Sequence, residues 1–393
     1  MALHMSDETA ETEELPIPVS SQVRPALIVD AAFLSENASM LRRFLVALVS
    51  DGFSPIIAGP GSLKGSDILS PSVEVAEYPV FHIPLLWMQN FTLLLETLEE
   101  LEPTVLHCLS PRRIGLTEAL AEALEAPYVA TFTRWPRMLF RPKVRATHCG
   151  QLIGTTAAVA GRLGREYPSM AASICQVSAG DFVEDRCACY AQPKRQTSVI
   201  AVQPLEDERF FEALLSAVRH LAIDGNDFAL AILGQGKASG AIHQTIRKLG
   251  LSRMVTVAPV IEPLQTVLSE ADLFLQSGRP LDINSALLDA MSVGMAVALS
   301  KDGLEETLIP GKAAEYFDPA DEYSIYACLQ KLLTQKDFAQ SLARGAQEYM
   351  RQHHSVSRMT EEMIRIYQHA QTWYQAQNKP AAAAAGMDSG HTG

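Results

Sequence analysis

The sequence predicts an α/β protein built from two domains, each with a parallel sheet. The chain has 393 residues, of which 48% are hydrophobic. It is too long for one ordinary core and long enough for two domains of about 150 to 200 residues each. Short apolar runs alternate with amphipathic helical segments in both halves of the chain. Successive strand, helix, strand units of this kind form parallel sheets with right-handed crossovers.

The first half contains the pattern of one such sheet. Its predicted strands lie at 26–29, 55–58, 73–75, 104–109 and 127–131, and its predicted helices at 40–50, 91–101 and 116–124. The helix at 40–50 turns Leu41, Phe44 and Leu48 inward, because they recur at the spacing of one helical face. The segment at 33–39 is predicted to be a turn between the first strand and the first helix.

The second half repeats this organisation. Its predicted strands lie at 198–202, 228–233, 255–257, 271–275 and 295–299. Its predicted helices lie at 210–221, 242–249, 323–333, 336–350 and 356–372. No internal repeat is visible beyond these two similarly built halves.

A loop and a short helix at 278–294 lie between the last two predicted strands. Asn284 and Ser285 suit the start of that helix, because their side-chain oxygens accept free N–H groups of its first turn. Those N–H groups and the positive end of the helix dipole form an anion site, for which phosphate is a common ligand. Asp289, one turn further along, is placed to reach a sugar hydroxyl. The alternative is a capped helix with nothing bound.

Charge and hydropathy limit the classes of partner. The net charge of -13 argues against a nucleic-acid binder or an anionic-membrane binder, since both need a basic surface. No apolar run is long enough to span a bilayer, and the first residues are acidic and polar. We therefore expect no transmembrane segment and a cytoplasmic protein. Residues 1–23 and 378–393 are expected to be a disordered arm and tail.

The six cysteines are scattered along the chain. In a reducing compartment they are most simply free thiols. Cys187 and Cys189 are the only close pair, and without a matching pair elsewhere they do not predict a zinc site.

Several segments follow one another in a definite order between Ser269 and Asp321. They are Ala271-Asp272-Leu273-Phe274-Leu275, Asp289-Ala290-Met291, Gly294, and Gly303-Leu304-Glu305-Glu306. This order resembles the donor-binding half of retaining, nucleotide-sugar-dependent glycosyltransferases of the GT-B fold, family 4 or group 1. In that family an Ala-Asp-Leu-Phe-Val strand is followed by Glu-x7-Glu, Ala-Met, a glycine and a Gly-x-x-Glu turn.

The resemblance implies the GT-B fold, with two Rossmann-like domains facing a central cleft. It implies an N-terminal acceptor-side domain at 24–183, a linker at 184–196, a C-terminal nucleotide-sugar-side domain at 197–355, and a helix at 356–377 that crosses back. The implied activity is transfer of a hexosyl group from a nucleotide-sugar donor to an unknown acceptor with retention. The resemblance implies no metal and no other cofactor.

The resemblance also assigns site residues. The donor-binding candidates are Gly234, Gly236, Lys237, Arg209, Glu262, Ile283, Asn284, Ser285 and Asp289, and the catalytic candidates are Asp282, Arg134 and His107. Among them Asp289 would hold the donor ribose, and Lys237 and Arg209 would meet the diphosphate. His107 resembles the family's Asp-Val-Val-His strand, although a single histidine at a strand end also fits a structural role.

Four functional positions of the family are altered here. Leu281 stands where the first acid of Glu-x7-Glu belongs, with Asp282 beside it, and Asp289 replaces the second acid. The glycine-rich acceptor turn corresponds to 33–39, which has no glycine, and a histidine of the N-terminal domain is absent. The family's Arg and Lys at the diphosphate are replaced by 203–209, which carries three acids that would repel a diphosphate.

A set of cations gathers near predicted strand ends of the first half: Arg112, Arg113, Arg134, Arg137, Arg141 and Lys143. If these side chains converge, they would hold an anionic acceptor or a protein partner. If they diverge, they are a solvated rim.

Two functional hypotheses therefore stay open. The retained Asp-Ala-Met, Gly-x-Gly and Gly-x-x-Glu segments favour a sugar transferase. The missing diphosphate cations favour a catalytically inactive GT-B protein that acts as a scaffold or partner subunit. Fold alone does not decide between them.

Overall fold

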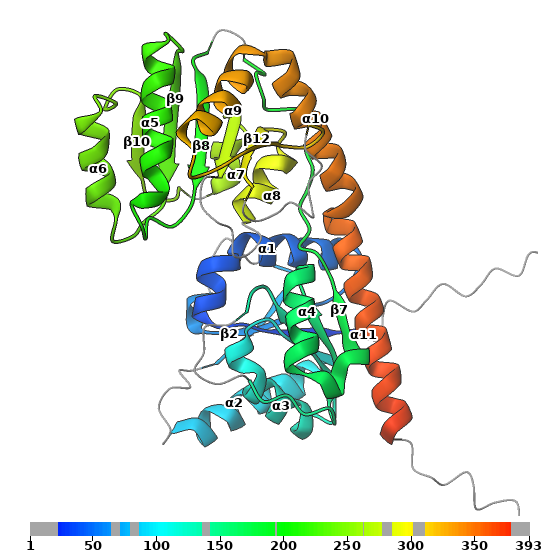
Figure 1. Ribbon diagram of the computed structural model, residues 1–393. Coiled ribbons are helices and arrows are strands. Elements are labelled where there is room, and N and C mark those ends of the chain that lie inside the picture. Colours follow the sequence, from blue (N-terminus) through cyan, green and yellow to red (C-terminus); the bar gives the residue numbers. More distant parts are fainter. Residues whose placement is uncertain are drawn as a thin grey trace, which may run out of the picture.

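The computed structural model describes residues 23–63, 71–78, 86–135, 142–192, 195–261, 263–276, 285–301 and 311–378, without the side chains of Ser35, Glu36, Ser62 and Phe210. These residues form two lobes, one above the other in Figure 1. Helices α10 (Lys336–His353) and α11 (Val356–Asn378) run along the edge of both lobes and connect them.

The N-terminal lobe contains a seven-stranded parallel sheet in the order β3-β2-β1-β4-β5-β6-β7. Its strands are β1 (Pro25–Ile28), β2 (Ile56–Gly59), β3 (Glu74–Glu77), β4 (Val105–Cys108), β5 (Tyr128–Phe132), β6 (Cys149–Gly154) and β7 (Ile174–Gln176). The chain runs from β1 outward to β3 and then returns to β4 on the other side of β1. The strand order therefore reverses between β1 and β4, the point at which open α/β sheets bind ligands.

Helices cover both faces of this sheet. On one face lie α1 (Ala31–Ser50) and α11, and on the other lie α2 (Trp87–Leu101), α3 (Ile114–Ala123) and α4 (Ala157–Glu166). Short 3-10 helices occupy Gly61–Leu63, Pro111–Arg113 and Pro168–Ser173. The result is a three-layer domain with an apolar core on each side of the sheet.

Helix α1 begins earlier than the sequence predicts. The segment at 33–39, expected as a turn, belongs to the helix, which is kinked where Asn37 departs from helical dihedrals. Asp30 starts the helix, because its Oδ1 accepts the N–H of Phe33 at 2.8 Å. Strand β1 thus passes directly into α1, without the expected connecting turn.

The C-terminal lobe contains a six-stranded parallel sheet in the order β10-β9-β8-β11-β12-β13. Its strands are β8 (Thr197–Val202), β9 (Phe228–Leu233), β10 (Val255–Ala258), β11 (Leu273–Gln276), β12 (Ala296–Ser300) and β13 (Glu315–Phe317). Its remaining helices are α5 (Arg209–Ile223), α6 (Ser239–Lys248), α7 (Leu264–Leu268), α8 (Ser285–Ser292) and α9 (Glu322–Thr334). One core packs α5, α6 and α9 on the sheet, and the opposite core packs α7 and α8. The strand order reverses between β8 and β11.

The predicted linker at 184–196 lies on the C-terminal lobe where it is described. The Glu184 N–H donates to the carbonyl of Ser292 at 3.0 Å, and the Cys189 N–H donates to that of Gly294 at 2.9 Å. The crossing between lobes therefore precedes this segment, at 177–183. The chain crosses back between α10 and α11, and α11 then packs on the N-terminal sheet.

The fold class predicted from sequence, two parallel-sheet α/β domains, is confirmed. Within the described part of the chain, no helix is long and apolar enough to cross a membrane.

Candidate functional site

The carboxyl edge of the C-terminal sheet carries five of the predicted donor-binding residues that the structure describes. Arg209 and Ser285 are the first residues of α5 and α8, the helices that follow β8 and β11. Gly234, Gly236 and Lys237 follow β9, next to β8. Ser285, Arg209 and Lys237 are exposed. These residues flank the β8/β11 reversal of strand order, where a ligand of this class of sheet is expected.

Other predicted positions fall outside the described residues. They are Asp282, Ile283, Asn284 and Glu262, together with the Gly303-Leu304-Glu305-Glu306 turn and two members of the basic set, Arg137 and Arg141.

The two glycines of the Gly234-x-Gly236 turn are required by backbone packing. A Cβ at Gly234 would collide with the carbonyl oxygen of Gln203, and one at Gly236 would collide with that of Leu205. The Leu205 carbonyl also accepts the N–H of Ala238 at 2.8 Å. The segment that follows β8 thus lies against the turn, and this contact accounts for both glycines without a ligand.

Arg209 is paired with a carboxylate. Its Nε lies 3.0 and 3.1 Å from the two carboxylate oxygens of Asp207, and its Nη2 lies 2.5 Å from Oδ2. Hydrogen bonds from the Arg209 side chain lower the pKa of Asp207 to about 2, so this carboxylate stays ionised. A diphosphate at this edge would have to compete with Asp207 for Arg209, whereas Lys237 is exposed beside them.

Asp289 is buried at the junction of the two lobes. Its Oδ1 lies 2.5 Å from Nη1 of Arg43 on α1, and the same Nη1 lies 3.2 Å from Oδ1 of Asp181 in the crossing segment. The exposed fractions of the three side chains are 6% for Arg43, 0% for Asp181 and 3% for Asp289. In contrast to the predicted ribose contact, the Asp289 carboxylate binds a cation of the other lobe.

Burial and charge change the acidity of this cluster. Burial is the main cause that raises the pKa of Asp181 to about 7, the positive charge of Arg43 opposes the rise, and the negative charge of Asp289 adds to it. Oδ2 of Asp181 and Nε of Arg43 are buried without a hydrogen-bond partner among the described residues. The cluster therefore holds two carboxylates and one guanidinium with incomplete hydrogen bonding.

His107 lies in the core of the N-terminal lobe, in contrast to its expected catalytic role. Its Nδ1 is 2.7 Å from the hydroxyl of Tyr367 and its Nε2 is 2.7 Å from Oγ1 of Thr131, so both ring nitrogens are hydrogen-bonded. Burial lowers its pKa to about 3, which keeps the ring neutral near pH 7. The residue joins β4, β5 and α11 and has no exposed atom for a substrate.

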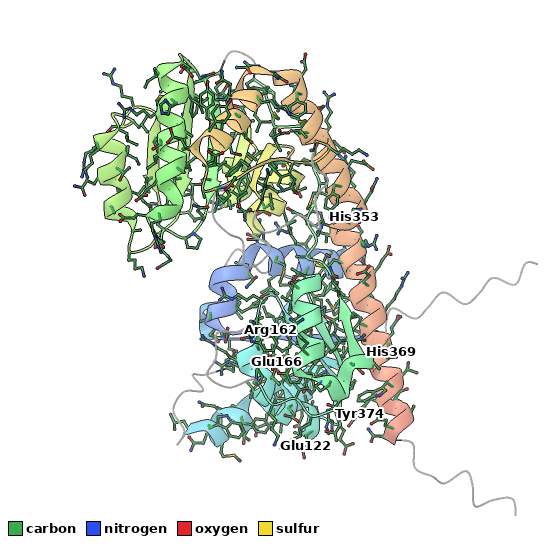
Figure 2. All side chains as sticks on the ribbon, viewed as in Figure 1. Glu122, Arg162, Glu166, His353, His369 and Tyr374 are labelled. Atoms are coloured by element: carbon green, nitrogen blue, oxygen red, sulfur yellow. The ribbon has the colours of Figure 1, made fainter. Side chains whose placement is uncertain are left out.

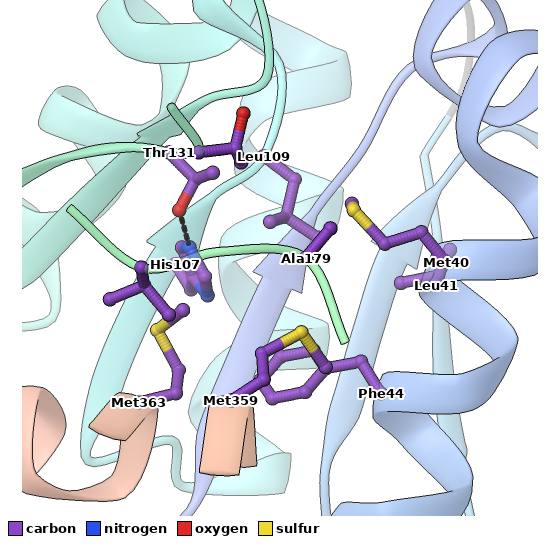
Figure 3. Close-up of a pocket in the computed structure, with 11 residues that line it drawn as sticks. Met40, Leu41, Phe44, His107, Leu109, Thr131, Ala179, Met359 and Met363 are labelled. Carbon is purple, nitrogen blue, oxygen red and sulfur yellow. Dashed lines mark hydrogen bonds between the residues drawn. The ribbon is translucent and has the colours of Figure 1, made fainter. Parts of the chain in front are cut away.

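An apolar cavity of about 30 Å³ lies between His107 and the junction. Figure 3 shows Met359 and Met363 of α11 facing Met40 and Phe44 of α1 across it, with the His107–Thr131 hydrogen bond at one side. The cavity leaves the flexible methionine side chains room to repack where α1 meets α11.

The described members of the basic set differ in environment. Arg112, Arg134 and Lys143 are exposed. Arg113 is half-buried, with its Nε 3.9 Å from Oδ2 of Asp30 and its guanidinium 5.3 Å from the ring centre of Tyr78. Arg113 therefore belongs to the internal packing of its lobe, and Arg134 remains an exposed group after β5.

Comparison with known proteins identifies the architecture. A glycosyltransferase from Rickettsia africae ESF-5 is similar with a TM-score of 0.69 and 15% identity, over 89% of this chain and 98% of that one. Anabaena HepE in complex with UDP and glucose is similar with a TM-score of 0.67 and 13% identity, over 87% of this chain and 98% of that one. The fold is GT-B.

Sucrose-phosphate synthase from Thermosynechococcus elongatus shares the GT-B architecture, with a TM-score of 0.63 and 16% identity over 90% of this chain and 100% of that one. Residues 189–349 match the family model described as Glycosyl transferases group 1. This match spans most of the C-terminal lobe. Among curated proteins, none matches the chain by sequence.

Sequence analysis did not identify two residues at the junction of the lobes, Arg43 and Asp181. Arg43 stands between the inward-facing Leu41 and Phe44 of α1, and a cation on the apolar side of a helix is a signal of a buried partner. Asp181 follows Gly180 just after the last N-terminal strand, where no local pattern reveals its burial. Both residues meet Asp289 only through the arrangement of the lobes.

Proposed function

We propose that the protein is a glycosyltransferase that moves a hexosyl group from a nucleotide-sugar donor to an acceptor of unknown identity, with retention and without a metal. The observation that carries this proposal is the match of residues 189–349 to the group 1 family, in the lobe where the predicted donor site lies. Anabaena HepE, a structure of similar fold, was solved with UDP and glucose. This is compatible with a uridine nucleotide as donor.

In this proposal the donor diphosphate lies at the carboxyl edge of β8 and β9. The N–H groups at the start of α8, near Ser285, and the ammonium of Lys237 hold its charge. Arg209 exchanges Asp207 for a phosphate oxygen, and Arg134 reaches the donor from the N-terminal lobe. As the bond to the sugar breaks, negative charge grows on the leaving diphosphate, and these cations stabilise it. Asp282, Glu262, Ile283 and Asn284 complete the site by family resemblance.

Nucleotide binding tests the proposal directly. Titration calorimetry with uridine, guanosine and adenosine diphosphates and their sugars should find at least one ligand. Lys237→Ala should weaken that ligand about tenfold to a hundredfold, because a hydrogen bond to a charged group contributes about 1.5–3 kcal/mol. Lys248→Ala is the matched control, since Lys248 is exposed at the far end of α6 in the same lobe. Equal affinities of the two variants would contradict a donor site at Lys237.

Two observations favour the second candidate, a catalytically inactive GT-B scaffold. The carboxylate of Asp289 forms an ion pair with Arg43, and the guanidinium of Arg209 forms an ion pair with Asp207. If no nucleotide in the panel binds and the full chain is recovered with a stoichiometric protein partner, the scaffold replaces the transferase. Nucleotide binding with sugar transfer to any acceptor would exclude the scaffold as the whole function.

A further inference from the structure

The Arg43, Asp181 and Asp289 cluster joins three parts of the molecule. Arg43 comes from α1 of the N-terminal lobe, Asp289 from α8 of the C-terminal lobe, and Asp181 from the segment that connects them. In Figure 1, α1 is the element of the lower lobe that faces α8 of the upper lobe. A single guanidinium therefore bridges both lobes and the crossing segment.

Asp181 is also fixed to the second crossing of the chain. Its backbone N–H donates to the carbonyl of His354 at 2.7 Å, and its carbonyl accepts the N–H of Val356 at 3.1 Å. A Cβ on the preceding Gly180 would come within 2.7 Å of Cα of Val356, so the two crossings are in close backbone contact. Figure 2 places His353 at this level, where α10 approaches α11. Asp181 thus connects the ion pairs to the second crossing of the chain.

The charges of the cluster do not balance when both carboxyl groups are ionised. One guanidinium then faces two carboxylates, which leaves one negative charge in a buried site, where uncompensated charge is costly. Oδ2 of Asp181 has no hydrogen-bond partner among the described residues. A proton on this oxygen would make the cluster neutral and would let Asp181 donate a hydrogen bond.

We propose that Arg43, Asp181 and Asp289 are an interdomain latch, which holds the lobes together when the carboxyl groups share a proton and loosens when that proton is lost. The latch needs no nucleotide, so it stands independently of the proposed activity. It makes the relative position of the two lobes depend on pH around the pKa of Asp181, about 7.

Other charged groups near the cluster do not supply the missing balance. Burial lowers the pKa of His354, whose Nδ1 is 3.3 Å from the carbonyl of Ala179, so this ring is neutral at pH 7 and above. On α11, Arg358 pairs with Glu362 at 3.1 Å. Just after the crossing segment, Glu184 is half-buried and Asp185 is exposed. Arg351 of α10 donates to the Glu184 carbonyl, and the neighbouring cation on α1 is the half-buried Arg42.

Small-angle X-ray scattering of the full chain tests the latch. The radius of gyration of the wild type should be larger well above the pKa of Asp181 than well below it. Asp181→Asn keeps the shape of the side chain and mimics its protonated form, so its radius should equal the low-pH value at both pH values. Arg43→Met removes the guanidinium that bridges Asp181 and Asp289, so it should show the larger radius even at the lower pH. Arg42→Met, which removes a charge from the adjacent position of α1, should behave as the wild type.

Two results would overturn the latch. One is a wild-type radius that does not change with pH, and the other is an Asp181→Asn radius that changes as much as that of the wild type. If Arg43→Met does not fold, Asp181→Asn alone decides, because it removes the titrating group and keeps the Arg43–Asp289 pair. Loss of nucleotide binding in any variant does not bear on this comparison.

Discussion

The two sheets carry polar side chains at corresponding edges, but these side chains differ in exposure. After β1 and β4 of the N-terminal lobe, Asp30 and Ser110 are 5% and 4% exposed, and the Ser110 hydroxyl donates to Oδ2 of Asp30 at 2.8 Å. After β8 of the C-terminal lobe, the Arg209 side chain is 79% exposed, and Lys237 is exposed beside it. The N-terminal groups form hydrogen bonds with one another, whereas the C-terminal groups face solvent. Polar residues at the first edge therefore stabilise the lobe, whereas at the second edge Arg209 pairs with Asp207 at the surface and Lys237 faces solvent.

Removal of Asp30 should have the largest effect on stability. Asp30→Ala deletes the N-cap of α1 and leaves the Ser110 hydroxyl and the nearby Arg113 guanidinium without their carboxylate. We expect a loss of about 2–4 kcal/mol in the free energy of unfolding, measured by chemical denaturation.

Thr156→Ala is the control for the Asp30 variant. It removes the cap of α4, where Oγ1 of Thr156 accepts the N–H of Val159 at 3.1 Å, and no further network is attached to this hydroxyl among the described contacts. Its cost should be about 1 kcal/mol. If both variants lose the same free energy of unfolding, Asp30 acts only as a helix cap, and its contacts with Ser110 and Arg113 add no stability.

His107 and Asp181 should make opposite contributions to the pH dependence of the free energy of unfolding. Between pH 6.5 and about 3, His107 binds a proton in the unfolded chain but not in the folded chain. The free energy of unfolding therefore decreases as pH falls through this range. Asp181 acts in the opposite direction. Between its usual pKa of 3.8 and about 7 the folded chain binds the extra proton, so its contribution to stability falls as pH rises.

The two trends oppose each other where their ranges overlap. The free energy of unfolding should therefore rise more steeply with pH in Asp181→Asn than in the wild type. In this variant the contribution of His107 is no longer opposed by that of Asp181. A nuclear magnetic resonance titration provides a direct check, since the His107 ring should not titrate near its usual pKa. Titration of that ring near pH 6.5 would show that the Tyr367 and Thr131 contacts are not maintained.

The strands could be predicted from sequence because they are buried on both faces. Runs such as 26–29 and 228–233 are continuously apolar, and the observed strands β1 and β9 lie within a residue of them. The start of α1 was missed because its signal is a single aspartate, Asp30, whose capping role depends on geometry. The pairing of Arg43 with Asp289, 246 positions apart, has no local signal at all. Strands follow from local pattern, whereas the junction follows from the assembly of the lobes.

Removal of Asp207 should have the smallest effect on stability and tests the exposed edge. Asp207→Ala deletes a carboxylate from a mostly exposed ion pair, so the free energy of unfolding should change by no more than about 0.5 kcal/mol. The freed Arg209 should then meet a nucleotide diphosphate without competition, and affinity in calorimetry should rise severalfold. Asp227→Ala removes an acid at the opposite end of the same sheet, just ahead of β9, and should leave affinity unchanged. Equal affinities in the two variants would mean that Arg209 does not contact the diphosphate, and the exposed edge would then resemble the N-terminal one in being unused by a ligand.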